Sequence, residues 1–235
     1  MAVPGSQAIR SYYRIRQAMG IQGLALPVLL VGGSLYLGDP LPPALSDYVY
    51  TPLEPLFTGV MFSIGVFLIS YLGYQRRGGP AWITDRRVST LAGLGALGIA
   101  LFPNDTFDPC GALDVRLFSF SGVAHVVSAG VFLAMTCVFC LVLFRRRIVG
   151  DNRRQKSRRN AVYLGCGLVI LAALAGLAYY FLGMDLADRC AIRDLRPVLW
   201  LEVATVWAFG LAWLVKGGGI RQLNDGHAPR GFARL

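Results

Sequence analysis

A single hydrophobic run, from Phe118 to Phe144, is followed directly by a dense block of positive charge. The block, from Arg145 to Arg159, reads RRRIVGDNRRQKSRR and has Arg or Lys at eight of its fifteen positions. The run is longer than the roughly 20 residues that an α-helix needs to cross the hydrocarbon core of a bilayer. An apolar helix that ends at a cationic segment is typical of a transmembrane span whose end faces the cytoplasm. This feature therefore predicts an integral membrane protein.

The composition favours a membrane protein over a soluble domain. Hydrophobic residues make up 55% of the 235 positions, charged residues make up 15%, and the mean hydropathy is +0.53. Soluble domains usually carry charge at roughly a quarter of their positions. The net charge of +10 does not indicate a nucleic-acid surface, because the positive residues lie between apolar runs. We therefore expect no nucleic-acid partner.

Six apolar segments predict an all-α fold, a polytopic integral membrane bundle of six helices. We expect residues 1–20 to form a cytoplasmic N-terminal segment, residues 21–216 the transmembrane domain, and residues 217–235 a flexible cytoplasmic tail. An internal repeat is not evident, so inverted-repeat transporter folds gain no support. The predicted spans are Ile21–Leu37, Leu56–Tyr74, Val88–Phe102, Phe118–Phe144, Val162–Leu182 and Pro197–Val215.

The distribution of charge over the loops predicts the orientation of the bundle. Six spans with both termini on one side collect 19 of the 23 Lys and Arg residues there, with three acidic residues. The opposite side has four arginines and nine acidic residues. Because Lys and Arg accumulate in cytoplasmic loops, both termini are expected in the cytoplasm and the protein in the cytoplasmic membrane. The block at Arg145–Arg159 is mainly a topology determinant, and anionic lipid headgroups are a second candidate role for it.

Small residues recur along the third predicted span. Ala92, Ala96 and Ala100 are spaced four residues apart and so share one face of a helix. Small side chains let the backbones of neighbouring membrane helices approach closely. We therefore expect another helix to pack closely on this face.

Two ionisable residues lie inside predicted spans at one depth. His125 is about seven residues from the outer end of the fourth span and Glu202 about five from that of the sixth, roughly 8 to 10 Å deep at ~1.5 Å per residue. Ionisable residues within a membrane usually face the bundle interior or a water-filled cavity. A His125–Glu202 pair is our candidate for catalytic acid–base chemistry or for substrate binding. The alternative is a pair that only fixes helix packing.

Further polar side chains accompany these two residues. Ser121 and Ser128 fall on the same helical stripe as His125, and Thr205 follows Glu202 at i+3. The sequence therefore predicts an outward-facing polar pocket in the outer leaflet, with Ser121, Ser128 and Thr205 among its ligand-binding residues. The outer-loop residues that we expect at its entrance are Tyr48, Tyr50 and Asp105.

The five cysteines fall into two groups. Cys110 and Cys190 are in predicted outer loops, where oxidation is permitted, and we predict a disulfide between them; two unpaired thiols are the alternative. Cys137, Cys140 and Cys166 lie in predicted spans and are interpreted as small packing residues. Cys137 and Cys140 have CxxC spacing, but they lie inside an apolar span, and no second such pair and no Cys/His ligand spacing accompanies them. The sequence therefore predicts no metal site and no cofactor.

Several stretches resemble a family of bacterial six-span membrane proteins of unknown function, similar in outline to the Frag/DRAM/Sfk group. The resemblance implies functional positions at a tyrosine-rich segment before the second span, a Phe-Pro after the third, a histidine in the fourth and a glutamate in the sixth. Here these are Tyr48, Tyr50, Phe102, Pro103, His125 and Glu202, with Val49 at the position of a third tyrosine. The stretches are SDYVYTPLEPLFTGVMFSIGVFLISYLGY (Ser46–Tyr74), LAGLGALGIALFP (Leu91–Pro103), AHVVSAGVFL around His125, RRNAVYLGCG (Arg158–Gly167) and LEVATVWAFGLAWLVKGG (Leu201–Gly218).

The resemblance and the predicted pocket together favour a lipid or another amphiphile as the ligand. Distant relatives of the resembled group act in lipid remodelling of GPI anchors, which implies a lipid ligand by analogy. Membrane hydrolases of the ceramidase and adiponectin-receptor type need several histidines around zinc, and the chain has only His125 and His227. A zinc-dependent membrane hydrolase of this type is therefore excluded.

Three functions stay open at this point. The first is binding or processing of a lipid or other amphiphile in the outer pocket, including a lipid-acting enzyme that uses His125 and Glu202. The second is a small-solute or proton-coupled transporter or channel, and the third is a noncatalytic partner subunit. The inner halves of two spans, Val131–Phe144 and Val206–Val215, are nearly wholly apolar, which favours a blind pocket over a through-path. We expect membrane lipids as partners, and both homo- and hetero-oligomers fit the sequence.

Overall fold

The structure is a computed structural model that describes residues 4–73, 83–105, 110, 119–146 and 153–223. Every regular element within these ranges is helical. The main helices are α1 (Pro4–Leu37), α2 (Glu54–Ile69), α3 (Asp85–Leu101), α4 (Phe120–Val138), α5 (Arg153–Ala178), α6 (Leu186–Ala191) and α7 (Pro197–Lys216). Short 3₁₀ turns occur at Ser46–Tyr50, Arg193–Leu195 and Arg221–Leu223, and π-helical turns extend α4 and α5 at Phe139–Leu143 and Tyr179–Gly183.

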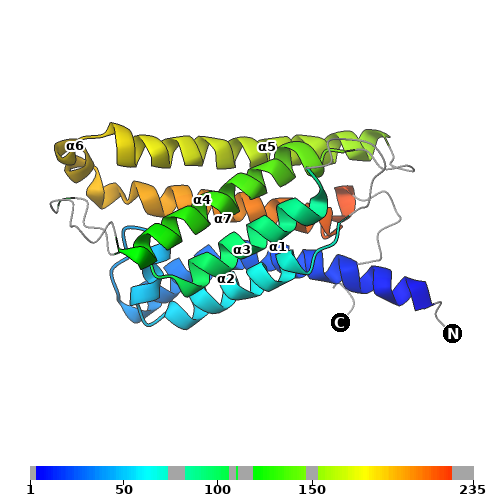
Figure 1. Cartoon of the computed structure of the whole chain (residues 1–235), viewed down its shortest axis with the longest axis horizontal. Coiled ribbons are helices and arrows are strands. Elements are labelled where there is room, and N and C mark those ends of the chain that lie inside the picture. The colour runs from blue at the N-terminus through cyan, green and yellow to red at the C-terminus, as the bar shows by residue number, and fades with distance from the viewer. Residues whose placement is uncertain (1–3, 74–82, 106–109, 111–118, 147–152, 224–235) are drawn as a thin grey trace.

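The long helices lie side by side along the long axis of the molecule (Figure 1). α1 ends, and α2, α4 and α7 begin, at the end of the bundle that also carries α6. We call this the disulfide end, because Cys110 is bonded to Cys190 there. At the opposite end α5 begins and α7 finishes, and Arg16 of α1 is buried. We call this the arginine end.

Four helical segments of the described chain are long and apolar enough to cross a membrane. They are Ile9–Leu37, Phe120–Leu143, Arg153–Gly183 and Arg193–Lys216. The helix Glu54–Ile69 is apolar but shorter. By length and composition the chain is therefore a multi-pass membrane protein, as the sequence predicts.

The first helix is longer than the sequence pattern indicates. It begins at Pro4 and runs without a break through residue 20, where we expected a separate segment to end. Arg16 and Gln17 are buried although they precede the apolar run. The Gln17 side-chain amide donates to the carbonyl of Gly217 at 2.7 Å, just past the end of α7. Contacts with the end of α7 thus stabilise the polar part of α1 as helix. The tail beyond residue 223 lies outside the described residues.

The small-residue face of α3 is a helix contact, as predicted. Ala92, Ala96 and Ala100 are all buried. The closest backbone approach, however, involves glycines next to this face. A Cβ on Gly93 would lie 2.7 Å from the carbonyl oxygen of Gly65 in α2. Glycine at both positions lets the two backbones approach more closely than any side chain would allow.

The contact between α1 and α7 depends on glycine in the same way. Gly23 of α1 faces Gly210 of α7, and a Cβ on Gly23 would lie 2.9 Å from the Gly210 Cα. A Cβ on Gly210 would lie 2.7 Å from the Leu24 nitrogen and 2.8 Å from the Gly20 oxygen. These neighbours are backbone atoms, so they cannot move away as a flexible side chain could. The contact brings the first and last long helices of the chain together.

We predict that Gly210→Ala destabilises the protein by about 1–3 kcal/mol, because the added methyl group overpacks a backbone contact. The matched control is Gly32→Ala in α1, where a Cβ would meet nothing within 4 Å. That change should be neutral or stabilise by up to about 1 kcal/mol, since alanine is the better helix former. Unfolding of both variants in detergent measures the difference. Equal stability of the two would contradict this packing.

Candidate functional site

The loop between α1 and α2 is held against the start of α7. Arg196 Nε donates to the carbonyl of Leu41 at 2.9 Å, and the Leu199 amide donates to the carbonyl of Pro43 at 3.0 Å. Arg196 itself has φ 47°, in the left-handed region, directly before Pro197. A following proline disfavours the right-handed helical region for the preceding residue, and few residues other than glycine adopt positive φ. The side-chain bond to the loop stabilises this turn.

Glu202 continues the attachment one turn further into α7. Its Oε2 accepts hydrogen bonds from the Leu45 amide at 2.6 Å and the Ser46 amide at 3.2 Å. Its Oε1 accepts from the Ser46 hydroxyl at 3.4 Å. These amides begin the 3₁₀ turn Ser46–Tyr50, and amides at the start of a helical turn have no partner within the turn itself. Glu202 therefore caps the turn and ties the loop to α7.

Asp47 is a buried carboxylate on the loop itself. It accepts a hydrogen bond from the Ala44 amide at 3.1 Å and another from the Asn104 side-chain amide. Burial raises the pKa of Asp47 to about 6, and the bonds from Asn104 and Ala44 offset part of this rise. Asp47 thus joins the loop to the chain segment that follows α3.

Asp105 lies beside the first turn of α4. Its Oδ1 accepts from the Ser119 hydroxyl at 2.7 Å, and the same hydroxyl accepts from the Gly122 amide at 2.9 Å and so caps α4. An ideal Cβ on Gly122 would lie 1.9 Å from Asp105 Oδ2, so glycine leaves the room that this carboxylate occupies. Within the described residues, Asp105 Oδ2 and the neighbouring Asn104 Oδ1 are buried acceptors that have no hydrogen-bond partner.

The polar stripe of α4 faces the end of α3. The His125 ring is buried, and its Nδ1 donates to the carbonyl of Phe102 at 2.8 Å. A carbonyl oxygen only accepts, so Nδ1 carries the proton and Nε2 is the acceptor in a neutral ring. The Ser121 hydroxyl donates to the carbonyl of Pro103 at 2.7 Å. Ser128 packs on Gly98, where a Cβ would lie 2.1 Å from the serine Oγ.

In the structure, His125 and Glu202 do not form the direct pair that we expected. His125 is bonded to the end of α3, whereas Glu202 is bonded to the loop between α1 and α2. Among the described residues, no hydrogen bond or ion pair joins them. The depth of a residue along a helix follows from its sequence position, but the direction in which its side chain points depends on how the helices pack. The two polar stripes face different neighbours.

The other predicted site residues have distinct environments. Tyr48 is fully buried and accepts from the Ser34 hydroxyl at 3.2 Å, so it belongs to the packing beneath the loop and not to an entrance. Tyr50 is 54% exposed, and its hydroxyl donates to the Asn104 carbonyl. The Thr205 hydroxyl donates to the carbonyl of Glu202, in its own helix, at 2.7 Å. Tyr50 thus lies at the rim of the site, whereas Tyr48 and Thr205 are internal.

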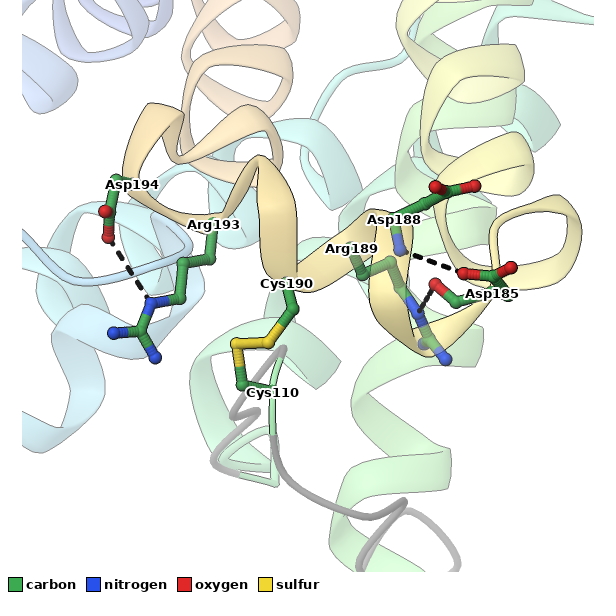
Figure 2. The surroundings of a disulfide bond; sticks show 7 residues. All are labelled: Cys110, Asp185, Asp188, Arg189, Cys190, Arg193 and Asp194. Carbon is green, nitrogen blue, oxygen red and sulfur yellow. Dashed lines mark hydrogen bonds and ion pairs between the residues drawn. A yellow bond between two sulfur atoms is a disulfide. The ribbon is translucent and has the colours of Figure 1, made fainter.

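The structure pairs Cys110 with Cys190, the disulfide that the sequence predicts, with a Cα–Cα distance of 4.9 Å. Figure 2 shows that Cys190 lies in α6, next to charged side chains. Asp185 caps α6 by accepting from the Asp188 amide at 2.9 Å, and its carbonyl accepts from Arg189 Nε at 3.3 Å. The disulfide thus connects the chain between α3 and α4 to the connection between α5 and α7.

Sequence reasoning missed two contributors to this site, Asn104 and the backbone of Leu45–Ser46. Asn104 links Asp47 and Tyr50, which come from another loop. Its position between the Phe102–Pro103 pair and Asp105 is the signal that could have identified it. The described residues contain no group of three or more His, Cys, Asp and Glu side chains that could hold a metal.

The comparisons with known proteins identify the family. A family model described as "Protein of unknown function (DUF998)" matches residues 21–215. The chain belongs to the DUF998 family. A search of curated proteins and a search of solved structures each found no match. The matched region begins within α1 and includes the other long helices up to residue 215. The Frag/DRAM/Sfk likeness stays a resemblance only.

The buried Asp47 of this DUF998 protein should make stability depend on pH. Its pKa is about 6 in the folded protein and about 4 when unfolded, so between these values the folded state binds more protons and its stability falls as the pH rises. Asp47→Asn should remove this contribution. From pH 4 to pH 7 the wild type should lose about 1–3 kcal/mol more than the variant. Unfolding midpoints at both pH values measure this loss.

Asp194→Asn is the control for that experiment, because the Asp194 side chain is 94% exposed. Its pH dependence should follow that of the wild type. If Asp47→Asn also follows the wild type, the buried carboxyl does not titrate as described.

Thiol labelling tests the disulfide. After unfolding without a reductant, three cysteines should react with an alkylating reagent: Cys137, Cys140 and Cys166. After reduction all five should react. In the variant Cys190→Ser, the released Cys110 should raise the unreduced count by one. The mass of the intact protein gives each number, and five reactive thiols before reduction would rule out the bond.

Proposed function

We propose that the disulfide end of this membrane protein binds the polar headgroup of a lipid or other amphiphile in the outer leaflet. The observation that carries the proposal is the pair of buried, unpartnered acceptors in the described structure, Asn104 Oδ1 and Asp105 Oδ2. A buried acceptor without a donor costs about 1–3 kcal/mol, so such groups usually take a water or a ligand. A headgroup that presents amine or hydroxyl donors complements both atoms.

The surroundings of these acceptors suit an amphiphile. Next to them, α3 ends and α4 begins with large apolar side chains that are exposed: Leu101 is 59% exposed and Phe120 is 80% exposed. The rings of Phe102 and Phe120 are in edge contact across the two helices, with centroids 5.8 Å apart. An acyl chain along this surface would bring its headgroup to the level of Asp105. Tyr50 at the rim adds an aromatic group at the membrane interface.

The orientation belongs to the same proposal. We take α2 and α3 to cross the membrane as well, because they run beside the longer helices (Figure 1). Six spans then put both termini at the arginine end, and the excess of Lys and Arg assigns this end to the cytoplasm. The disulfide end then faces the outside, where disulfide bonds persist.

Binding is better supported than acid–base catalysis or transport. Glu202 is engaged by two backbone amides, and His125 Nδ1 by a backbone carbonyl, so both side chains support the walls of the site. The cytoplasmic halves of α4 and α7 are almost entirely apolar. The one buried hydroxyl there, on Thr136, donates to the Phe132 carbonyl in its own helix at 2.8 Å.

Native mass spectrometry of the protein extracted gently from membranes tests the proposal. The wild type should retain one lipid or small amphiphile with donor groups, at a fixed stoichiometry. Asp105→Ala should lose it, because the charged acceptor at the centre of the site is removed. Asp188→Ala is the matched control, since it removes an exposed carboxylate at the same end. It should retain the ligand.

Two outcomes would contradict this function. One is that the wild type, Asp105→Ala and Asp188→Ala carry the same mixture of lipids. The other is that the wild type retains no species at all. In either case Asn104 and Asp105 would be satisfied by water, and the polar groups of this end would serve the packing of the loops.

A further inference from the structure

The two unpartnered atoms of the disulfide end are both hydrogen-bond acceptors, and the bonds around them fix this chemistry. Asn104 Nδ2 donates to the Asp47 carboxylate, so within the described residues the amide oxygen Oδ1 is the atom left without a partner. A reversed amide would place its oxygen against a carboxylate oxygen, and neither could donate. Asp105 Oδ1 accepts from the Ser119 hydroxyl, which leaves Oδ2. A ligand at this place must therefore bring donors.

Three carboxylates contribute negative charge to the same end of the bundle. Asp47 and Asp105 both lie near enough to the Tyr50 hydroxyl to act on it electrostatically. Asp47 and Glu202 also act on each other. In the described structure, the donors to these three carboxylates are backbone amides, serine hydroxyls and one side-chain amide. All of these donors are neutral, so the bonds stabilise the carboxylates without cancelling their charge.

The described arginines at this end are bonded to other groups. Their partners are the carbonyl of Leu41 for Arg196, the carboxylate of Asp194 for Arg193 and the carbonyl of Asp185 for Arg189. The start of α4 adds roughly half a positive charge beside Asp105, which offsets only part of the negative charge. A ligand that fits this end therefore brings positive charge as well as donors.

We propose that the ligand of this site is an amphiphile with a primary ammonium headgroup, whose N–H groups bond to Asp105 Oδ2 and Asn104 Oδ1. This inference rests on the function proposed above and names the class of its ligand. A primary ammonium group has three N–H donors and a positive charge, so it meets both requirements at once. Its bond to a carboxylate is roughly twice as strong as a bond between neutral groups.

Other common headgroups meet only one of the two requirements. A trimethylammonium group carries the positive charge but has no N–H, so both buried acceptors would stay without a donor. A glycerol headgroup offers hydroxyl donors but has no positive charge. The site should therefore discriminate among lipids that share the same acyl chains and differ only in the headgroup.

The test titrates the purified full-length protein in detergent with three short-chain lipids, phosphatidylethanolamine, phosphatidylcholine and phosphatidylglycerol. Phosphatidylethanolamine should bind saturably and about tenfold more tightly than either of the other two. Thermal unfolding of each variant described below checks that it is folded.

Asp105→Asn tests the role of the charge, because it keeps the size of the side chain and an oxygen acceptor. It should weaken the binding of phosphatidylethanolamine by about tenfold and change that of phosphatidylglycerol by less than about threefold. The preference for the amine is then lost, whereas a purely structural defect would weaken both lipids equally. The matched control is Asp188→Asn, at an exposed position of α6 (Figure 2). It should keep the preference of the wild type.

A pair of glycine variants gives a second test that leaves the carboxylate in the sequence. A Cβ on Gly122 would lie 1.9 Å from Asp105 Oδ2, whereas a Cβ on Gly130, further along α4, would meet nothing within 4 Å. Gly122→Ala should displace the carboxylate and reduce the preference for phosphatidylethanolamine by about tenfold. Gly130→Ala should keep it. This pair decides the question where Asp105→Asn unfolds early.

The primary ammonium group has two sources, a lipid headgroup and a soluble amine. Ethanolamine, added as a competitor of phosphatidylethanolamine, distinguishes them. If it competes with the wild type and fails to bind to Asp105→Asn, the site takes soluble amines as well. If it does not compete while the lipid shows the expected preference, the site takes the lipid headgroup. Both results support a primary ammonium ligand.

The outcomes separate this inference from the proposed function. If phosphatidylglycerol binds as tightly as phosphatidylethanolamine and Asp105→Ala loses both, a headgroup with donors binds here but the ammonium is not selected, so this inference alone fails. If phosphatidylcholine binds as tightly as the other two, the buried acceptors do not recognise the headgroup and both proposals fail. Both also fail if none of the three lipids binds saturably.

Discussion

The disulfide end depends on the hydrogen bonds that the carboxylate of Glu202 accepts. Two backbone amides of the loop between α1 and α2 donate to it, at 2.6 Å and 3.2 Å. Leu45 and Ser46 are buried, so their amides need an acceptor within the protein, and the Glu202 carboxylate supplies it. Once this loop is fixed to α7, Asp47 can hold Asn104, and Asn104 brings the end of α3 to the same place. The arrangement of the polar groups at the disulfide end therefore depends on the attachment of the loop between α1 and α2 to α7.

The two ends of the bundle have opposite electrostatic character, and each uses its own kind of stabilisation. Carboxylates at the disulfide end are held by backbone amides, hydroxyls and a side-chain amide. Cations at the arginine end are held by backbone carbonyls and aromatic rings. Between the two ends, glycines allow α1 to pack on α7 and α2 on α3 at backbone distance. Most of the charged groups therefore lie at the two ends, and close helix packing dominates the middle of the molecule, where Gln22 and Ser63 also form a hydrogen bond between α1 and α2.

Much of this organisation can be predicted from residue order, and the errors have one cause. The 3.6-residue period correctly grouped Ser121, His125 and Ser128 on one stripe, because helical geometry is local. The predicted partner of that stripe, Glu202, was wrong. The stripe faces the end of α3, because the contact with α3 decides the rotation of α4 about its own axis. Asn104 was missed for the same reason, since its role depends on a loop more than fifty residues earlier in the chain. The extra length of α1 was missed because Arg16 and Gln17 look like solvent-exposed residues until α7 covers them.

By itself, the sequence determined that the protein is helical and apolar enough for a membrane, and it determined which polar residues share one face of a helix. These properties depend on composition and on distances along one helix. Its prediction of a bond between Cys110 and Cys190 agrees with the structure. Only the tertiary structure decided which groups meet: Glu202 with the first loop, His125 with Phe102, and Arg16 with Tyr71 and Lys216. The physical reason is that side-chain direction follows from helix rotation and close backbone contact, which arise only when all the helices are packed together.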